Sequence, residues 1–209
     1  MTLLNKKLEI IDSYIEELIM LGKESAETHG LYTYDLFCMA ILNRSVNILR
    51  GYTLLVRDKN FIAAAPLVRV HLDSLLRLYA STLVSYNIDD FALKILAGKQ
   101  ISNLKDRDGN KMRDRYLAKK LSEVKNLEWV LDVYNAGSGH IHFSNFATSS
   151  STKLDSEKER TILGIIGKHD EFVADEEKVG ATVRMHQIST NIVASISLWT
   201  KQKKGYKNN

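Results

Sequence analysis

The sequence predicts an all-α fold: a single-domain bundle of six or seven helices, with a small β-hairpin near residues 160–174. Two observations carry this prediction. Apolar residues recur at intervals of three and four along most of the chain, which is the period of amphipathic helices. Only 1 proline and 11 glycines interrupt the 209 residues, whereas a turn-rich β-sandwich needs many more. The 44% hydrophobic content is ordinary for a globular chain of this length.

The formal net charge of +4 comes from the C-terminal end of the chain. The last nine residues contain no acid and hold four lysines: Lys201, Lys203, Lys204 and Lys207. Without them the net charge is 4 − 4 = 0, so the composition does not indicate a nucleic-acid-binding body. We therefore expect a helical domain over residues 1–200 and a frayed basic tail over residues 201–209.

Composition also bounds the compartment. The single cysteine, Cys38, excludes an internal disulfide and a cysteine-rich zinc site, and it suits a reducing cytosol. No apolar run approaches the roughly 20 residues that a membrane-spanning helix needs. The first residues, MTLLNKKLEIID, become polar too early for a secretory signal. We expect a cytoplasmic protein with no membrane partner.

Two amphipathic helices are predicted in the first 60 residues. The first begins near Leu4, and its pattern fades over residues 22–32. The second runs from about Thr33 to Val56 and is apolar on two faces, which is typical of a central helix. Its polar residues Asn43 and Asn47 share a third strip, with Arg44 beside it. That strip either faces solvent or faces the third helix.

The third helix, predicted over Asn60–Asn87, is the longest and most apolar run, and we place it at the centre of the bundle. The break between the second and third helices, Arg57-Asp58-Lys59-Asn60, is short, so the two should pack as an antiparallel hairpin. Its proline, Pro66, is expected to kink the first turns. His71 lies about 200° around the helix from Arg69 and is expected at a surface or an interface.

A charged stripe runs along this apolar helix. Arg69, Asp73 and Arg77 recur at i, i+4 and i+8 and therefore share one face. Arg69 and Asp73 should form an intrahelical ion pair, worth only ~0.3–0.5 kcal/mol if exposed. Because leucine and valine surround them, these charges should instead line a pocket or a polar interface.

The charge density peaks after a short helix predicted over Asp89–Lys99. Residues 105–120 hold seven basic and three acidic side chains, which favours either a solvated loop or a phosphate-contacting patch. A calcium loop is excluded, since the glycine is misplaced and the closing glutamate is missing. Two more short helices are predicted near Arg113–Lys125 and Leu127–Ala136.

The helical pattern is expected to stop at Gly137-Ser-Gly139, because glycine frees the backbone. A polar loop should follow over residues 147–159. Residues 160–166 are β-branched and could pair with residues 171–174 as a small hairpin. The final helix is predicted from about Asp175 to Lys201.

The candidate chemistry lies in the segment Gly-Ser-Gly-His-Ile-His. In an extended conformation His140 and His142 point the same way, so both imidazoles could face one site. Such a pair could supply a general base and a general acid near neutral pH. A structural role, in which the histidines cap a helix or bond a carbonyl, is the alternative. Asp73 could complete a metal site with them only through the fold.

Two blocks, NFIAAAPLVRVHLDSLLRLY and VYNAGSGHIHFSN, together resemble a group of uncharacterised bacterial helical proteins distantly related to the HEPN superfamily. Arg69 and Asp73 match the alanine-rich, Leu-Arg-containing helix of that group. Tyr134, Ser138 and a histidine match its "Tyr … Ser … His" turn. The resemblance spans about residues 33–144 and implies a helical, commonly homodimeric protein. Many HEPN domains are metal-independent ribonucleases of toxin or anti-phage systems.

The sequence departs from the HEPN signature, in which an arginine precedes a histidine by a few residues. Asn135 stands five residues before His140, where that arginine is expected. Arg69 could replace the missing guanidinium from another helix.

The resemblance implies a protein of bacterial defence or stress response that cleaves or binds RNA without a metal or cofactor. His140 or His142 would activate a ribose 2′-hydroxyl, Arg69 and Arg77 would stabilise the phosphorane charge, and Asp73 would orient one of these groups. Six polar residues could support that site: Asn43, Asn47, Tyr134, Asn135, Ser138 and Ser144.

Two other functions stay open. The chain could be a non-catalytic helical module that binds a partner or a small ligand, as an antitoxin or a structural partner does. It could also be a metal-dependent hydrolase, which requires a carboxylate within ligand distance of both histidines.

Overall fold

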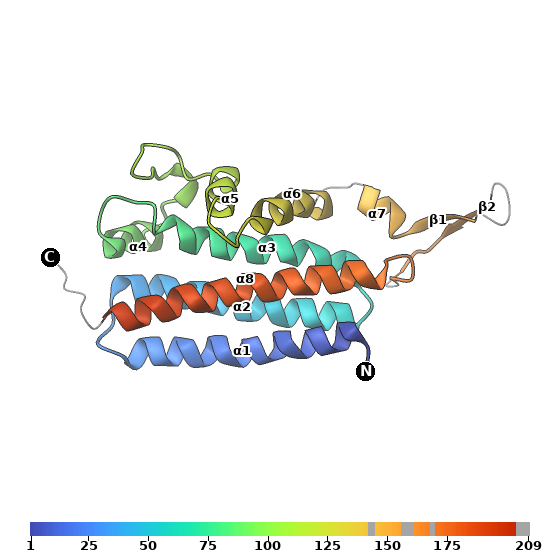
Figure 1. Ribbon diagram of the computed structural model, residues 1–209, viewed down its shortest axis with the longest axis horizontal. Coiled ribbons are helices and arrows are strands. Elements are labelled where there is room, and N and C mark those ends of the chain that lie inside the picture. Colours follow the sequence, from blue (N-terminus) through green and yellow to red (C-terminus); the bar gives the residue numbers. More distant parts are fainter. Residues whose placement is uncertain (142–144, 156–160, 168–169, 204–209) are drawn as a thin grey trace.

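The computed structural model describes residues 1–141, 145–155, 161–167 and 170–203. Within these ranges four long helices lie side by side as the body of the molecule (Figure 1). They are α1 (Leu3–Glu27), α2 (Thr33–Arg57), α3 (Phe61–Ala80) and α8 (Asp175–Gln202). The prediction of an all-α bundle is confirmed, with eight α-helices in the described part of the chain rather than six or seven.

The shorter helices lie together over one side of α3 (Figure 1). They are α4 (Ile88–Leu96), the 3₁₀ turn η1 (Ile101–Asn103), α5 (Asp114–Ser122), α6 (Trp129–Ile141) and α7 (Asn145–Ser149). Since α5 and α6 pack on one side of α3 while α2 and α8 pack on the other, α3 has the central place that its apolar sequence predicted.

The core follows the apolar stripes of these helices. Leu72 and Leu76 of α3 are fully buried, as are Leu49 of α2 and Ile188 of α8. Pro66 lies inside α3, which begins at Phe61, so the helix includes the alanine-rich turns before the proline. The helix ends at Ala80, seven residues earlier than its composition suggested.

A small antiparallel hairpin is present, but its pairing differs from the expected one. Strand β2 (Thr161–Gly164) pairs with β1 (Thr152–Asp155), with Thr152 opposite Gly164. The expected partner, residues 171–174, instead forms the turn that leads into α8 and buries Val173 in the core. The hairpin extends beyond the end of the helical bundle (Figure 1).

The prediction of a break at Gly137-Ser-Gly139 is wrong, because α6 continues through this segment to Ile141. Gly137 allows close helix packing here rather than a turn. A Cβ atom at this position would lie 2.6 Å from Cβ of Arg69 on α3, so only glycine lets the two helices approach this closely.

The first three residues of the expected frayed tail, 201–203, belong to the helical body. Residues 201 and 202 belong to the last turn of α8, and Lys203 is buried. Its ammonium group lies 3.0 Å from the Asp35 carboxylate and donates to the Ser25 carbonyl at 2.6 Å. The remaining tail, residues 204–209, lies outside the described residues. None of the described helices combines the length and the apolarity that crossing a membrane requires.

Candidate functional site

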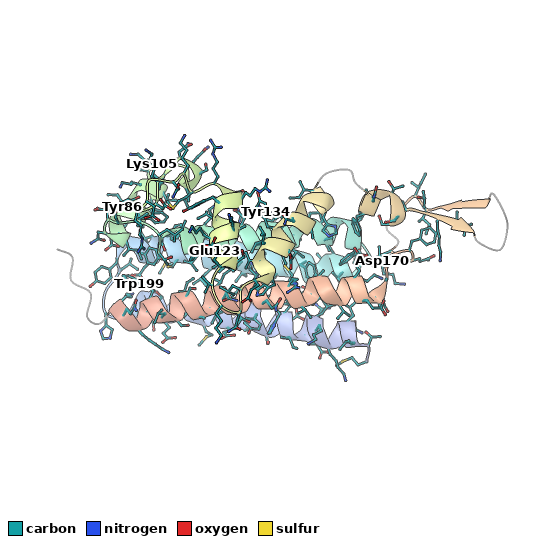
Figure 2. The ribbon with its side chains drawn as sticks, turned by 45° about the horizontal axis from the view of Figure 1, so that its top comes forward. Tyr86, Lys105, Glu123, Tyr134, Asp170 and Trp199 are labelled. Carbon is teal, nitrogen blue, oxygen red and sulfur yellow. The ribbon has the colours of Figure 1, made fainter. Side chains whose placement is uncertain are left out.

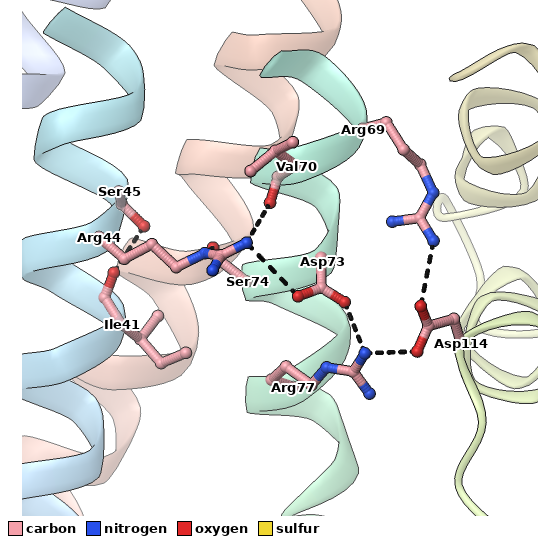
Figure 3. Close-up of polar contacts among 9 residues, drawn as sticks. All are labelled: Ile41, Arg44, Ser45, Arg69, Val70, Asp73, Ser74, Arg77 and Asp114. Atoms are coloured by element: carbon pink, nitrogen blue, oxygen red, sulfur yellow. Dashed lines mark hydrogen bonds and ion pairs between the residues drawn. The ribbon is translucent and has the colours of Figure 1, made fainter. Parts of the chain in front are cut away.

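The charged stripe of α3 forms an ion-pair network that extends to α2 and α5 (Figure 3). Arg77 pairs with Asp73 one turn earlier at 2.8 Å, and it also contacts Asp114 of α5. Arg69 pairs with Asp114 at 3.4 Å. The expected pair between Arg69 and Asp73 is therefore replaced by two pairs that share a carboxylate from another helix.

Asp114 is the member of this network that sequence reasoning missed. It occupies the first turn of α5, where the positive end of the helix dipole favours a carboxylate. Its side chain is 37% exposed, whereas that of Arg69 is 11% exposed. The sequence did hold one sign of this role, because Asp114 is an acid at the start of a predicted helix within a basic run. The sequence does not identify the partners of Asp114, however, since they lie 37 and 45 residues earlier.

From α2, Arg44 joins the ion-pair network, whereas the predicted asparagines do not. The Arg44 guanidinium lies 3.5 Å from Asp73, and its Nε donates to the Ser74 hydroxyl at 3.1 Å. Asn43 and Asn47 instead line a groove between α1 and α2, where the Asn47 amide donates to the Asn43 carbonyl. These two asparagines do not join the α3 network.

The carboxylates around Arg77 do not satisfy every hydrogen-bond donor of its guanidinium. Burial opposes the charged form, but the carboxylates of Asp73 and Asp114 raise the pKa of Arg77 above its ordinary value. Its Nη1 is buried and has no hydrogen-bond partner within the described part of the chain. A buried donor without an acceptor costs free energy, so the pairing of Arg77 is incomplete.

Arg77 and Asp114 form part of the wall of a cleft of about 770 Å³. The cleft lies between the C-terminal part of α3, η1, α5 and α6. Its polar and charged wall residues are Arg77, Lys99, Gln100, Ser102, Arg113, Asp114, Arg115 and Tyr134. Four cations face one carboxylate, so the charges on the wall sum to 4 − 1 = +3.

Tyr134 joins this cleft to the contact between α3 and α6. The residue is labelled in Figure 2, where it comes from α6. The Arg69 guanidinium lies 4.3 Å from the centre of the Tyr134 ring, a cation–π contact. One turn further along α6, Gly137 packs against the Arg69 side chain. Arg69 is thereby held between its carboxylate partner and α6.

His140 lies beyond this contact and does not line the basic cleft. Its ring meets the Phe146 ring edge-on at 4.4 Å, and it lines a separate pocket with Glu177 of α8. Burial lowers the pKa of His140, opposed in part by the Glu177 charge, so the imidazole is neutral at pH 7. Within the part of the chain that the structure describes, no hydrogen bond, ion pair or ring contact joins His140 to Arg69 or Asp73.

The structure describes only some of the remaining predicted site residues. Asn135 is exposed on α6. Ser138 belongs to the same helix. His142 and Ser144 lie outside the described residues.

Of the two positions expected for His71, a surface or an interface, the surface one is excluded because the residue is buried where α3 packs on α8. Its Nε2 lies 3.0 Å from the Ser189 hydroxyl of α8, and none of its side chain is exposed. Burial, together with the Arg44 charge, lowers the pKa of His71 to about 3. This histidine therefore helps to pack α3 on α8 and has no access to the cleft.

Within the described ranges no three histidine, cysteine, aspartate or glutamate side chains gather as a metal site would require. No protein-family model, curated protein or solved structure matches the chain. The resemblance to HEPN proteins therefore stays a prediction.

Proposed function

We propose that this protein binds single-stranded RNA in the basic cleft between α3, η1, α5 and α6. The observation that carries the proposal is the charge of the cleft wall. Lys99, Arg113 and Arg115 join Arg77 there, while the chain without its last nine residues has no net charge. A local excess of cations on a neutral body attracts a polyanion to one place.

The side chains of the cleft suit a single strand. Proteins that bind single-stranded nucleic acids combine a positive groove with aromatic rings on which bases stack. Tyr134 supplies an aromatic ring beside the cations, and Gln100 and Ser102 supply hydrogen-bonding groups. The choice of RNA over DNA, and a place in bacterial defence or stress response in the cytoplasm, rest on the HEPN resemblance.

Binding is better supported than cleavage. Cleavage through a ribose 2′-hydroxyl needs an imidazole beside the scissile phosphate. His140 lines another pocket, and His142 lies outside the described residues. In addition, Arg69 and Arg77 already pair with carboxylates, which reduces the positive charge they offer to a transition state.

The rival function is a helical interaction module without a nucleic-acid ligand. Its support is the same internal pairing, because a network of arginines and carboxylates can serve packing alone. In that case Arg113 and Arg115 would be ordinary solvated residues. The homodimer implied by the HEPN resemblance is compatible with both functions, and light scattering after gel filtration measures it.

The test is the affinity for a fluorescent 12-nucleotide RNA, measured by polarisation at several salt concentrations. We expect Arg113→Gln/Arg115→Gln to lower the affinity at least tenfold and to reduce the salt slope by about 1.4, since each cation contributes about 0.7 on a single strand. The matched control, Lys6→Gln/Lys23→Gln, removes the same charge from exposed positions on α1 and should bind as the wild type does.

Equal losses in both double variants, or no binding by the wild type near physiological salt, would contradict the proposal. The same RNA incubated with EDTA reports cleavage. If the wild type cuts it, His140→Ala and His142→Ala identify the histidine responsible, and intact binding by the inactive variant separates cleavage from affinity.

A further inference from the structure

A second pocket lies between α3, α6 and α8, on the other side of the contact between Arg69 and α6. Its volume is about 270 Å³, near the lower end of the roughly 300–1,000 Å³ of small-molecule sites. None of its wall residues belongs to the basic cleft. It is therefore a separate site of small-molecule size.

The interior of this pocket is apolar. Phe61, Ala65 and Val68 come from α3, Val133 and Ala136 from α6, and Ala181 from α8. Small side chains on the facing helices leave the space between them open. Gly180 belongs to this wall, and a Cβ atom there would meet no atom within 4 Å. Such a surface favours a ligand with an apolar body.

His140 adds one directional polar group to the apolar wall. Its Nδ1 is buried and has no hydrogen-bond partner within the described ranges. The low pKa caused by burial keeps the ring neutral near pH 7, so one ring nitrogen can accept a hydrogen bond. Because Nδ1 is shielded from solvent, the imidazole contributes the accessible part of its ring to the pocket wall.

The charged residues at the rim of the pocket determine which sign of charge a ligand can carry. Glu177 and Asp132 are exposed wall residues, and neither forms an ion pair with any residue that the structure describes. The cation of the wall, Arg184, donates to Gln187 at 2.8 Å and lies 5.7 Å from the Trp129 ring. Among the described residues, then, neither carboxylate is paired with a cation, and the wall carries two acids and one base.

We propose that the pocket between α3, α6 and α8 binds a small organic amine with a single-ring apolar body. The ring would lie against Phe61 and Val68, and the ammonium group would meet Glu177 and Asp132 at the rim. A carboxylate of the same size would meet the same two charges with the opposite sign and would be rejected. The proposal does not rest on RNA binding in the basic cleft, because the two sites share no wall residue.

The experiment uses 2-phenylethylamine as the probe, with 2-phenylethanol and phenylacetate as its neutral and anionic counterparts. Each is titrated into ¹⁵N-labelled full-length protein at pH 7, and the backbone and imidazole resonances are followed by NMR. We expect saturable shifts at His140 and along α6 and α8 with the amine. The alcohol should bind at least fivefold more weakly, and the acid should give no saturable shift.

Two variants locate the site. Gly180→Leu places a side chain in the open space and should abolish amine binding, and the loss of a helical glycine should leave the protein folded. Ala194→Leu, an exposed position of the same helix, is the control and should bind normally. Glu177→Gln/Asp132→Asn should remove the preference of the amine over the alcohol.

Equal affinity for amine and acid, or normal amine binding by a folded Gly180→Leu protein, would overturn the proposal. Shifts confined to residues outside α3, α6 and α8 would do the same, because the probe would then bind elsewhere.

Discussion

Asp35 and Asp114 each bind side chains from distant parts of the chain, but their surroundings differ. Asp35 is fully buried at the end of the bundle, where it accepts hydrogen bonds from Trp199 at 2.8 Å and Ser25 at 3.1 Å and pairs with Lys203. Asp114 has a side chain that is 37% exposed, and it pairs with Arg69 and Arg77 at the edge of the cleft.

The difference separates a structural cluster from one that can still bind. At Asp35 one carboxylate meets one ammonium group, and both are completely removed from solvent. At Asp114 the network holds three arginines and two carboxylates, an excess of 3 − 2 = +1, and a guanidinium nitrogen of Arg77 has no partner within the described residues. Complete pairing offsets the cost of burial, whereas incomplete pairing at a solvent-accessible wall leaves capacity for a ligand.

The largest expected effect tests the structural cluster. Lys203→Ala should lower the free energy of unfolding by about 3–5 kcal/mol, because it leaves the Asp35 carboxylate buried without its cation. Urea unfolding measures this loss. Lys201→Ala removes an exposed lysine two residues earlier in α8 and should stay within about 0.5 kcal/mol of the wild type. Similar stabilities for the two variants would show that Asp35 does not depend on its ion pair.

The contact between α3 and α6 is tested by Gly137→Ala. The new Cβ would overlap the Arg69 side chain, so α6 must move away from α3 at a cost of roughly 1–3 kcal/mol. Gly180→Ala is the matched control, since it gains the same helix propensity in open space and should be neutral or stabilising. Equal stabilities of the two variants, measured by urea unfolding, would contradict the close contact.

The next effect on stability is expected at His71, which is buried and forms no ion pair with the described residues. The pKa of His71 is lowered in the folded state, so below about pH 6.5 the unfolded chain binds a proton that the folded chain does not. Stability should therefore fall by about 1.4 kcal/mol for each pH unit from about 6.5 towards 3. His71→Leu should flatten this dependence between pH 5 and 6.5, measured by urea unfolding, whereas His29→Asn at an exposed position should not.

The smallest effect on stability is expected at the Asp114 cluster. Asp114→Asn should cost only about 1 kcal/mol because these pairs are partly exposed to water. It should also tighten RNA binding severalfold, since it removes the one carboxylate from the cleft wall. Polarisation with the labelled RNA measures this gain. Weaker binding would instead mean that Asp114 positions the arginines for the ligand.

Periodicity was sufficient to predict the four long helices and the central place of α3, because burial on two sides requires the apolar pattern that this helix carries. It also predicted that Arg69, Asp73 and Arg77 needed partners. The identity of those partners depends on tertiary structure, since Asp114 and Arg44 come from other helices.

Glycine was the main source of error. In the sequence, Gly137-Ser-Gly139 is indistinguishable from a helix end, whereas in the structure Gly137 permits close packing on Arg69. A second error concerns Lys203. The lysine-rich composition of the last nine residues assigned it to a tail, whereas it pairs with the buried Asp35 carboxylate, 168 residues earlier.

The packing of Gly137 on Arg69 has a thermodynamic consequence for the two proposed sites. Arg69 contacts Asp114 and Tyr134 on the side of the basic cleft, while Gly137 belongs to the wall of the other pocket. A ligand in either site that shifts this contact changes the free energy of the other site. Linkage then requires that RNA and amine alter each other's affinity by the same factor, whichever binds first.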